Sequence, residues 1–197
     1  MKRLSWKYIA GLIDGEGCID VVFNKSSSKA QTTTLIPRVR VTFVNSCLFV
    51  LETLQTNHGG WINSRHFDNP KWQDPSTWTL QGKQFRAFMQ NIVNHLEIKK
   101  EQAKLAIWIQ DNLRHKGMQQ AEDVKQCARK ELSAMKADPQ RLSEAAILRI
   151  VNTQGFHGHW SSKASCCKNC GTTDRKHEAH GLCEACYKKS RYHEKKN

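Results

Sequence analysis

The sequence predicts an α+β fold in which helices and antiparallel strands alternate along a chain of 197 residues. Three observations lead to this prediction. An apolar helical stretch at residues 8–17 ends in carboxylates and glycines and runs directly into a strand-like stretch. Residues 34–44 alternate between apolar and polar side chains, as a half-buried strand does. Apolar residues recur at helical spacing between residues 83 and 114.

The first predicted helix places its apolar residues at helical spacing, at Leu4, Tyr8, Ile9, Leu12 and Ile13. Ala10 and Gly11 are small at positions where a core helix usually carries bulky side chains. This pattern suits a helix that packs very closely against a second helix. The alternative is an ordinary amphipathic helix with an acidic, glycine-containing end.

Two carboxylates and two glycines mark the end of this helix. Gly15 and Gly17 provide the backbone freedom to stop the helix, which leaves Asp14 and Glu16 at its C-terminal end. Carboxylates are unfavourable there because the helix dipole is negative at that end. A divalent cation held by a carboxylate and free helix-end carbonyls would relieve this conflict, and Mg²⁺ favours such oxygen ligands.

Two strands and a helix are predicted next. Residues 18–25 and 34–44 have strand patterns, and in the second Val39, Val41 and Phe43 lie on one face, opposite Arg38, Arg40 and Thr42. One face is therefore core and the other is polar and basic. Asn45 or Ser46 can cap the following helix, which continues to Gly59-Gly60. The apolar residues of that helix are Phe49, Val50, Leu51 and Leu54.

Two more strands and several helices complete the predicted order. Strands are predicted at residues 61–67 and 77–81, separated by Asn-Pro and Asp-Pro turn signals. Helices near 83–95 and 99–114 follow, with apolar faces made of Phe85, Phe88, Met89, Ile92, Val93, Leu105, Ile107, Trp108 and Ile109. Residues 120–153 carry further helices, broken at Asp138-Pro139, which either buttress the core or join an interface between two chains. Their buried candidates are Leu132, Met135, Leu142, Ala146, Ile147 and Ile150.

The charge balance favours a polyanionic partner. The formal net charge is +13 and the pI is near 9.5. Nucleic acid is the first candidate because neutralising phosphates releases counterions, and a membrane surface is the weaker alternative. No apolar run approaches the roughly 20 residues of a transmembrane helix, and the N-terminus lacks a signal-peptide core. We therefore expect a soluble protein in an intracellular, reducing compartment, either a bacterial or phage-infected cytoplasm or an organelle.

The cysteines indicate a metal site near the C-terminus. Of eight cysteines, five lie between Cys166 and Cys186, whereas Cys18, Cys47 and Cys127 are scattered. Two C-x-x-C pairs have the spacing of four thiolate ligands of a tetrahedral Zn²⁺: Cys167, Cys170, Cys183 and Cys186. Gly171 and Gly181 lie where the two turns need freedom. A disulfide pair is the alternative, and His177 and His180 are either substitute ligands or solvated surface groups.

Composition also suggests how the chain is divided. Residues 1–154 form the predicted core with its C-terminal helices, 155–165 a linker, and 166–197 a zinc-binding module with a basic tail. The last segment has too few apolar residues to fold by burial alone, so zinc binding would supply its folding free energy. Its tail, Tyr187 to Lys196, either contacts phosphates or is merely solvated.

Residues 9–17, Ile-Ala-Gly-Leu-Ile-Asp-Gly-Glu-Gly, resemble the LAGLIDADG motif of homing endonucleases. They depart from it by Ile9 in place of Leu, Gly15 in place of the second Ala and Glu16 in place of the second Asp. The resemblance extends over about residues 4–114 and does not include the zinc segment. It implies an α-β-β-α-β-β-α core in which a saddle-shaped antiparallel sheet lies on DNA and helices cover its back. Because the motif occurs once, the chain is similar to the single-motif members of the family, which act as homodimers.

The resemblance also implies catalytic residues and a mechanism. Glu16 matches the catalytic metal-binding carboxylate and would hold Mg²⁺ together with Gly15. Lys99, with Lys100 as its neighbouring alternative, matches an active-site lysine, and Asn45 is a further polar candidate. The implied dimer interface involves Ala10, Gly11 and Asp14. Two such helices at a two-fold axis would place two active sites so that both strands of a long pseudo-palindromic site are cut, leaving 3′ overhangs. The resemblance implies this activity both for a chain encoded by an intron and for one encoded by a free-standing gene.

Base contacts are expected from the polar face of the sheet. Arginine pairs well with guanine, and asparagine or glutamine with adenine, in the major groove. The predicted DNA-binding residues are Asp20, Val22, Asn24, Ser26, Arg38, Arg40, Thr42, Asn63, Arg65, Thr77, Thr79 and Gln81. The zinc module would lengthen the contact with DNA.

Three other functions remain open. An intron maturase uses the same fold on RNA, a DNA-binding regulator keeps the fold without cleavage, and a zinc-dependent scaffold would bind protein partners. Glu16 and Lys99 argue against the second, and the net charge of +13 argues against the third.

Overall fold

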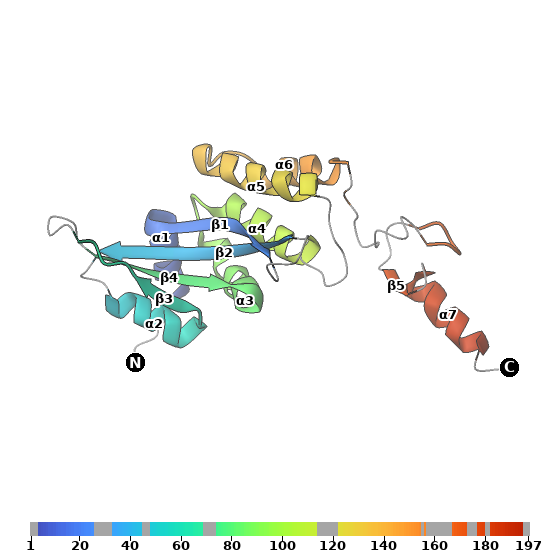
Figure 1. The fold of residues 1–197 in the computed structure, drawn as a ribbon, viewed down its shortest axis with the longest axis horizontal. Helices are drawn as coiled ribbons and strands as arrows, with labels where there is room; N and C mark the ends of the chain where they lie inside the picture. The colour runs from blue at the N-terminus through green and yellow to red at the C-terminus, as the bar shows by residue number, and fades with distance from the viewer. Residues whose placement is uncertain are drawn as a thin grey trace.

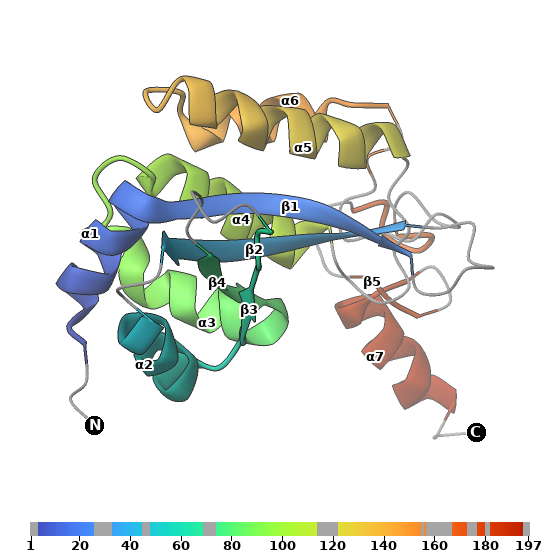
Figure 2. The ribbon, with the colours of Figure 1, turned by 60° about the vertical axis from the view of Figure 1, so that its left-hand side comes forward.

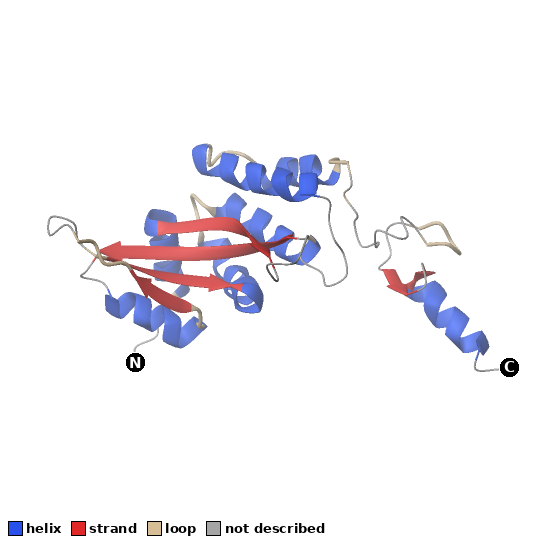
Figure 3. Ribbon diagram, in the orientation of Figure 1, coloured by secondary structure: helices blue, strands red, loops and turns tan. Residues whose placement is uncertain are grey.

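A computed structural model describes residues 4–25, 33–44, 48–68, 74–113, 122–154, 156, 167–172, 177–179 and 182–194. The first half of the chain forms α1 (Trp6–Glu16), β1 (Gly17–Lys25), β2 (Thr33–Val44), α2 (Leu48–His58), β3 (Trp61–Ser64) and β4 (Pro75–Gln81). The second half continues with α3 (Gly82–Ile92), a short 3-10 turn (Val93–His95), α4 (Lys100–Asn112), α5 (Glu122–Ala137) and α6 (Ser143–Val151). Figures 1 and 3 show these elements, and the predicted order of helices and strands is confirmed.

The four strands β1 to β4 form one antiparallel sheet with the order β1-β2-β4-β3. Helices α1, α3 and α4 pack on one face of it, through contacts with β2 and its neighbours. Helix α5 contacts β1, the edge strand, and runs beside it with α6 (Figures 1 and 2). We call the face opposite α1, α3 and α4 the outer face.

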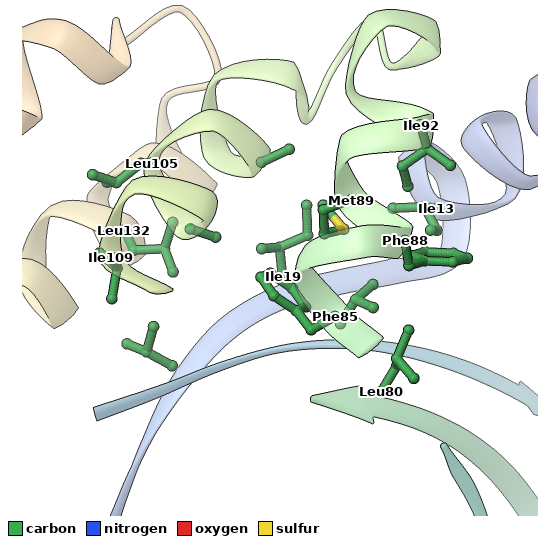
Figure 4. Close-up of a cluster of buried hydrophobic side chains, with 14 of the residues drawn as sticks. Ile13, Ile19, Leu80, Phe85, Phe88, Met89, Ile92, Leu105, Ile109 and Leu132 are labelled. Carbon is green, nitrogen blue, oxygen red and sulfur yellow. The ribbon is translucent and has the colours of Figure 1, made fainter. Parts of the chain in front are cut away.

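The core lies between the sheet and its helices. Val39 and Val41 of β2 are completely buried, as are Trp78 and Leu80 of β4, so the predicted alternation along the second strand is confirmed. Figure 4 shows how side chains from α1, α3 and α4 meet those of the strands; its labelled residues are Ile13, Ile19, Leu80, Phe85, Phe88, Met89, Ile92, Leu105, Ile109 and Leu132. Leu132 belongs to α5, so the C-terminal helices extend this core and buttress it.

The boundaries of α1 have local causes. The Ser5 side chain caps the helix by accepting a hydrogen bond from the Tyr8 amide at 3.2 Å. At the other end, Gly17 has an extended backbone with φ −80°, and Gly15 is still helical. The prediction that their conformational freedom stops the helix is therefore wrong. Gly17 is required for space, because a Cβ there would lie 2.6 Å from the Ile13 carbonyl oxygen.

Three residues predicted on apolar faces are exposed instead. Tyr8 is 50% exposed, Phe49 65% and Leu142 60%. Phe49 points away from the side of α2 that carries Val50, Leu51 and Leu54, and Leu142 precedes the first turn of α6.

Of the helices that the structure describes, none combines the length and apolar character needed to cross a bilayer.

One ion-paired carboxylate joins α6 to α4. Glu101 of α4 accepts hydrogen bonds from the amide and the hydroxyl of Ser143, at 2.9 Å and 2.6 Å, and pairs with Lys104. Burial would raise the pKa of Glu101, but the bonds from Lys104 and Ser143 outweigh it and lower the pKa from 4.5 to about 2.

Glu101→Gln is expected to lower the free energy of unfolding by about 1–3 kcal/mol near pH 7, because charge-assisted hydrogen bonds at the start of α6 are lost. The pKa of Glu101 is lower in the folded than in the unfolded state, so its stabilisation is complete above about pH 4.5 and disappears as the pH falls toward 2. Urea denaturation should therefore show a difference in the free energy of unfolding between variant and wild type that becomes smaller as the pH falls from about 4.5 toward 2. Glu144→Gln, an exposed carboxylate on α6, is the control. Equal stability of wild type and Glu101→Gln near neutral pH would contradict this assignment.

Candidate active site and nucleic-acid interface

The C-terminal end of α1 brings an exposed carboxylate beside a loop from the middle of the chain. Glu16 is the last residue of α1, and both Glu16 and Gly15 are exposed. Asp14, two residues earlier in the helix, points to the opposite side, since two residues correspond to a rotation of about 200°. Its carboxylate accepts hydrogen bonds from the amides of Glu97 and Lys99, each at 2.8 Å. The two carboxylates therefore differ: Asp14 anchors the loop before α4, whereas Glu16 faces solvent.

Lys99 reaches the same helix end. Its ammonium group donates hydrogen bonds to the carbonyl oxygens of Ile13, at 2.9 Å, and of Asp14. A positive charge there is favourable because the helix dipole is negative at its C-terminus. Burial lowers the pKa of Lys99 below its usual value, although the charges of Asp14, Cys18 and Glu16 act to raise it. The structure thus joins Lys99 and Glu16 at one helix end.

The predicted dimer-interface residues do not share one environment. Ala10 is fully buried in the core of its own chain, so the prediction that it contacts a second chain is wrong. Asp14 is likewise committed to its own chain through residues 97–99. Gly11 is exposed, and a Cβ there or at Gly15 would meet no atom within 4 Å. The exposed side of α1, formed by Tyr8, Gly11 and Gly15, is open to close approach.

The outer face of the sheet is polar and basic, as predicted. Cross-strand pairs place Asp20 opposite Arg38 and Arg38 opposite Gln81. A second row pairs Cys18, Arg40, Thr79 and Trp61, and a third pairs Thr42, Thr77 and Asn63. The hydroxyl groups of Thr42 and Thr77 are 2.9 Å apart. Arg65 follows β3 and is exposed, as is Asn24 of β1.

Two predicted base contacts are not available on this face. Thr79 is only 4% exposed because it lies between Arg40 and Trp61 in its row. The carboxylate of Asp20 accepts three hydrogen bonds from arginine side chains, so it is not free to accept one from a base. Asn45 and Ser26 lie outside the described residues.

Helix α5 borders the outer face, an arrangement that was not predicted from the sequence. The ammonium group of Lys136 lies 3.3 Å from Cys18 Sγ on this face, whereas the guanidinium of Arg129 lies 5.4 Å above the ring of Phe23, which is on the core side of β1. A hollow of about 210 Å³ separates β1 from α5 and is lined by Asp20, Val21, Val22, Arg38, Arg129, Leu132, Ser133 and Lys136. Helical spacing of the basic residues on α5 is the signal that would have identified this edge.

The four predicted cysteines come together. They lie in the turn at Cys167 to Gly171, in β6 (Leu182–Cys183) and in α7 (Glu184–Glu194), and β6 pairs with β5 (His177–Ala179). Their sulfur atoms all lie within 4.8 Å of one another, and Cys170 Sγ is 3.7 Å from Cys183 Sγ. Four ligands about 2.3 Å from a tetrahedral Zn²⁺ are roughly 3.8 Å apart, whereas a disulfide requires about 2.05 Å. The cluster therefore suits Zn²⁺ and not a disulfide.

Backbone geometry in the first cysteine turn supports this ligand set. Gly171 has φ +67°, a left-handed conformation that favours glycine, and its amide donates to the Cys167 carbonyl at 2.8 Å. Burial would raise the pKa of the Cys167 thiol, but amide donors, that of Cys183 first, lower it to about 6. Gly181, His180 and Cys166 lie outside the described residues, as does the side chain of His177.

Comparison with known proteins identifies a known domain within the chain. The sequence model described as LAGLIDADG endonuclease matches residues 9–104, a range that includes Glu16 and Lys99. No curated protein matches the sequence. The fold is similar to that of the homing endonuclease I-CvuI in complex with its target in the presence of calcium, with a TM-score of 0.53, 17% identity, and coverage of 75% of this chain and 95% of that one.

A second structure of I-CvuI gives the same result. It contains the I-CreI target and magnesium with the DNA not cleaved, and it matches with a TM-score of 0.50, 16% identity and the same coverage. At these identities the two structures support the fold alone. The family model adds a similarity in sequence to this similarity in fold. Its match begins within α1, the helix that ends in Glu16. The chain therefore contains a LAGLIDADG endonuclease domain, which the family model matches over residues 9–104.

Proposed function

We propose that this chain is a site-specific DNA endonuclease that acts as a homodimer and hydrolyses phosphodiester bonds with the help of a divalent metal ion. The observation that supports it best is the end of α1, next to the outer face: Glu16 is exposed there, and the Lys99 ammonium group binds carbonyl oxygens of the same helix end. A carboxylate, a fixed cation and a basic surface are the components that metal-assisted cleavage of a phosphodiester requires.

The residues at this helix end fit Mg²⁺. Glu16 offers carboxylate oxygens, and the carbonyl of Gly15 lies in the last turn of α1, where carbonyls lack helical partners. These hard oxygen donors leave room for the several waters that Mg²⁺ retains. A bound Mg²⁺ would activate a water molecule and neutralise charge on the scissile phosphate. The nearby carbonyls of Ile13 and Asp14 already accept hydrogen bonds from Lys99, so Gly15 is the favoured backbone ligand.

Lys99 would act as a fixed positive charge. Its ammonium group is held by two carbonyls at the helix end, so it does not have to be ordered when DNA binds. From this position it would stabilise the negative charge that develops on the phosphate during cleavage. Lys100, the neighbouring alternative, is the first residue of α4, whereas the side-chain contact with the end of α1 comes from Lys99.

We propose that two chains pair through the exposed side of α1. Gly11 and Gly15 let a second helix approach closely, and Tyr8 provides an exposed aromatic rim. A two-fold axis between paired helices would bring two Glu16 side chains close together, where each directs cleavage of one strand. A symmetric dimer of this kind reads a pseudo-palindromic site. The resemblance to homing endonucleases adds a staggered cut with 3′ overhangs.

The outer face would supply the base contacts. After Thr79 is excluded and Asp20 is assigned to its arginine partners, the candidates that the structure describes are Val22, Asn24, Arg38, Arg40, Thr42, Asn63, Arg65, Thr77 and Gln81. Arginine and amide side chains on adjacent strands can each read a base edge in the major groove.

We further propose the division into a core at residues 1–154, a linker at 155–165 and a zinc-binding module at 166–197. The module would add contacts with DNA outside the site read by the sheet. A tethered second contact raises affinity through effective concentration.

Cys170→Ser is expected to lower the affinity for DNA by about tenfold or more while the core stays folded, because the module loses a zinc ligand and its fold. Zinc content, circular dichroism and DNA affinity of the full chain measure the three effects. Cys127→Ser, which alters a thiol in α5, is the matched control and should keep zinc and affinity. Wild-type affinity in Cys170→Ser would overturn the proposed role of the module.

Selection of cleaved molecules from a library of double-stranded DNA in Mg²⁺ tests the proposed function. We expect the full chain to cut one long, nearly symmetric sequence and to leave unrelated sequences intact. DNA that stays intact under all conditions would overturn the proposal. Promotion of RNA splicing by a chain that cuts no DNA would favour the maturase alternative.

A further inference from the structure

We propose that Asp20 is a positioning residue that sets the base specificity of the outer face by holding the guanidinium groups of Arg38 and Arg40 side by side. This inference rests on the proposed function, since it concerns how the same surface reads DNA. It assigns to Asp20 an indirect role in recognition, through two arginines, in place of a direct contact with a base.

The geometry around Asp20 is specific. Arg38 donates two hydrogen bonds, from Nε to Asp20 Oδ1 at 2.6 Å and from Nη2 to Oδ2 at 3.1 Å. Arg40 donates from Nη2 to Oδ2 at 2.7 Å. Asp20 and Arg38 are direct cross-strand partners, and Arg40 is the diagonal neighbour two residues along β2. One carboxylate therefore orients two arginines on the same strand.

Partial burial strengthens these contacts. The side chain of Asp20 is 16% exposed, and those of Arg38 and Arg40 are 26% and 35% exposed. Helix α5 closes the outer side of Asp20 across the hollow described above, with Ser133 and Lys136 in its wall. Ion pairs that are partly removed from water are screened less than pairs on an open surface.

The charges around Asp20 agree with this picture. Burial would raise the pKa of Asp20, but the hydrogen bond from Arg38 and the charges of Arg38, Arg40 and Lys136 outweigh burial and hold the pKa below its usual value. Burial would lower the pKa of Arg40, but the charge of Asp20, followed by that of Cys18, outweighs burial and raises the pKa above its usual value. The carboxylate therefore stays ionised and bound at neutral pH.

Arg40 shows that its position depends on Asp20. Its Nε atom is buried and has no hydrogen-bond partner within the part of the chain that the structure describes. A buried donor without a partner is unfavourable, so this side-chain position is stable only if another contact compensates for it. Nη2 provides such contacts: it donates to Asp20 Oδ2 at 2.7 Å and lies 3.7 Å from Cys18 Sγ, and the shorter, charged contact with Asp20 fixes the direction of the guanidinium group.

Fixed guanidinium groups matter for reading DNA. Arginine discriminates guanine through two hydrogen bonds, to O6 and N7, which require a defined direction of approach. A free arginine can instead turn to the nearest phosphate, which carries no sequence information. Ordering the side chain before binding also removes part of its entropy loss in the complex. Asp20 would thus favour base contacts of Arg38 and Arg40 over phosphate contacts.

The test compares the base preference of wild type and Asp20→Asn, using the full chain, randomised double-stranded DNA and sequencing of the bound molecules without cleavage. Arg38→Gln and Arg40→Gln first show which base pairs depend on each arginine. Asp20→Asn is expected to lose preference by about tenfold at those same base pairs. Its affinity for random DNA should be equal or higher, because one negative charge is removed from the surface that binds phosphates.

The matched control is Asp111→Asn. Asp111 of α4 accepts two hydrogen bonds from Arg86 of α3, so the substitution removes a similar pair from the helical side of the molecule. It should leave base preference unchanged. Thermal unfolding checks that each variant is folded. If Asp20→Asn proves unstable, Asp20→Glu takes its place. Asp20→Glu keeps the charge and should retain part of the base preference. In the background that combines Arg38→Gln and Arg40→Gln, Asp20→Asn should have no further effect on base preference.

The outcomes separate this inference from the proposed function. If Asp20→Asn keeps the wild-type preference while the arginine variants change it, the positioning role is wrong and the DNA interface stands. If Asp20→Asn weakens binding evenly to all sequences, its role is structural and the inference is overturned. If wild type binds no DNA or shows no base preference, the proposed function itself fails.

Discussion

Glu16→Gln is expected to reduce DNA cleavage by at least about a thousandfold while folding and DNA binding are retained, because the variant loses the carboxylate that would hold the catalytic metal ion. The substitution keeps the size of the side chain and removes only its charge. Glu16 is exposed at the end of α1, so the fold does not depend on it. Single-turnover cleavage of the selected site in Mg²⁺, with binding measured in parallel, checks both parts.

The control for this prediction is Glu52→Gln, which neutralises an exposed carboxylate on α2. It should cleave at the wild-type rate. Binding of DNA by Glu16→Gln should be equal to or tighter than that of wild type, because a negative charge near the phosphates is removed. A rate for Glu16→Gln within tenfold of wild type would show that Glu16 is not the metal ligand.

Gly11→Leu is expected to convert the dimer to a monomer and to abolish double-strand cleavage. A Cβ at Gly11 meets no atom of the described residues within 4 Å, so the leucine fits the folded monomer. It also raises helix propensity by about 0.8–1 kcal/mol relative to glycine. The same side chain would separate the two helices of a dimer by the width of a leucine. Analytical ultracentrifugation and thermal unfolding measure assembly and stability independently.

A leucine elsewhere is the matched control for Gly11→Leu. Ala87→Leu adds an exposed leucine to α3 and should leave assembly and cleavage unchanged. A dimeric and active Gly11→Leu variant would show that the exposed side of α1 is not the interface. A monomeric wild type that cleaves both strands would contradict the proposed assembly directly.

Much of the fold was predictable because its signals are local. Alternation along residues 34–44 identifies a strand whose one face is core, and Val39 and Val41 are indeed fully buried. The four cysteines were predictable for the same reason, since each C-x-x-C pair forms its own turn. The spacing of Cys167, Cys170, Cys183 and Cys186 predicts one four-cysteine cluster, and their sulfur atoms do lie together in the structure.

Sites that depend on contacts between distant segments were less predictable. The contact of Lys99 with the end of α1 joins positions 85 residues apart, and only the family resemblance suggested it. Residues Ala10 and Gly11 were predicted to face one partner, but neighbouring residues on a helix point about 100° apart. One of them consequently enters the core while the other stays exposed.

The role of Asp20 illustrates the same limit. Alternation correctly placed it on the outer face, but its partners depend on the register between β1 and β2. In that register Asp20 faces Arg38 directly and reaches Arg40, so the carboxylate is engaged before any DNA arrives. Thr79 follows the same rule, because its burial results from its cross-strand neighbours Arg40 and Trp61.

The central claim is that each of two α1 ends cuts one strand of DNA. Mixed dimers of wild-type and Glu16→Gln chains, carrying different affinity tags and purified for both, test it most directly on the selected site in Mg²⁺. We predict that a mixed dimer nicks one strand at the wild-type position and leaves the other intact. Cleavage of both strands by the mixed dimer, or of neither, would contradict the claim.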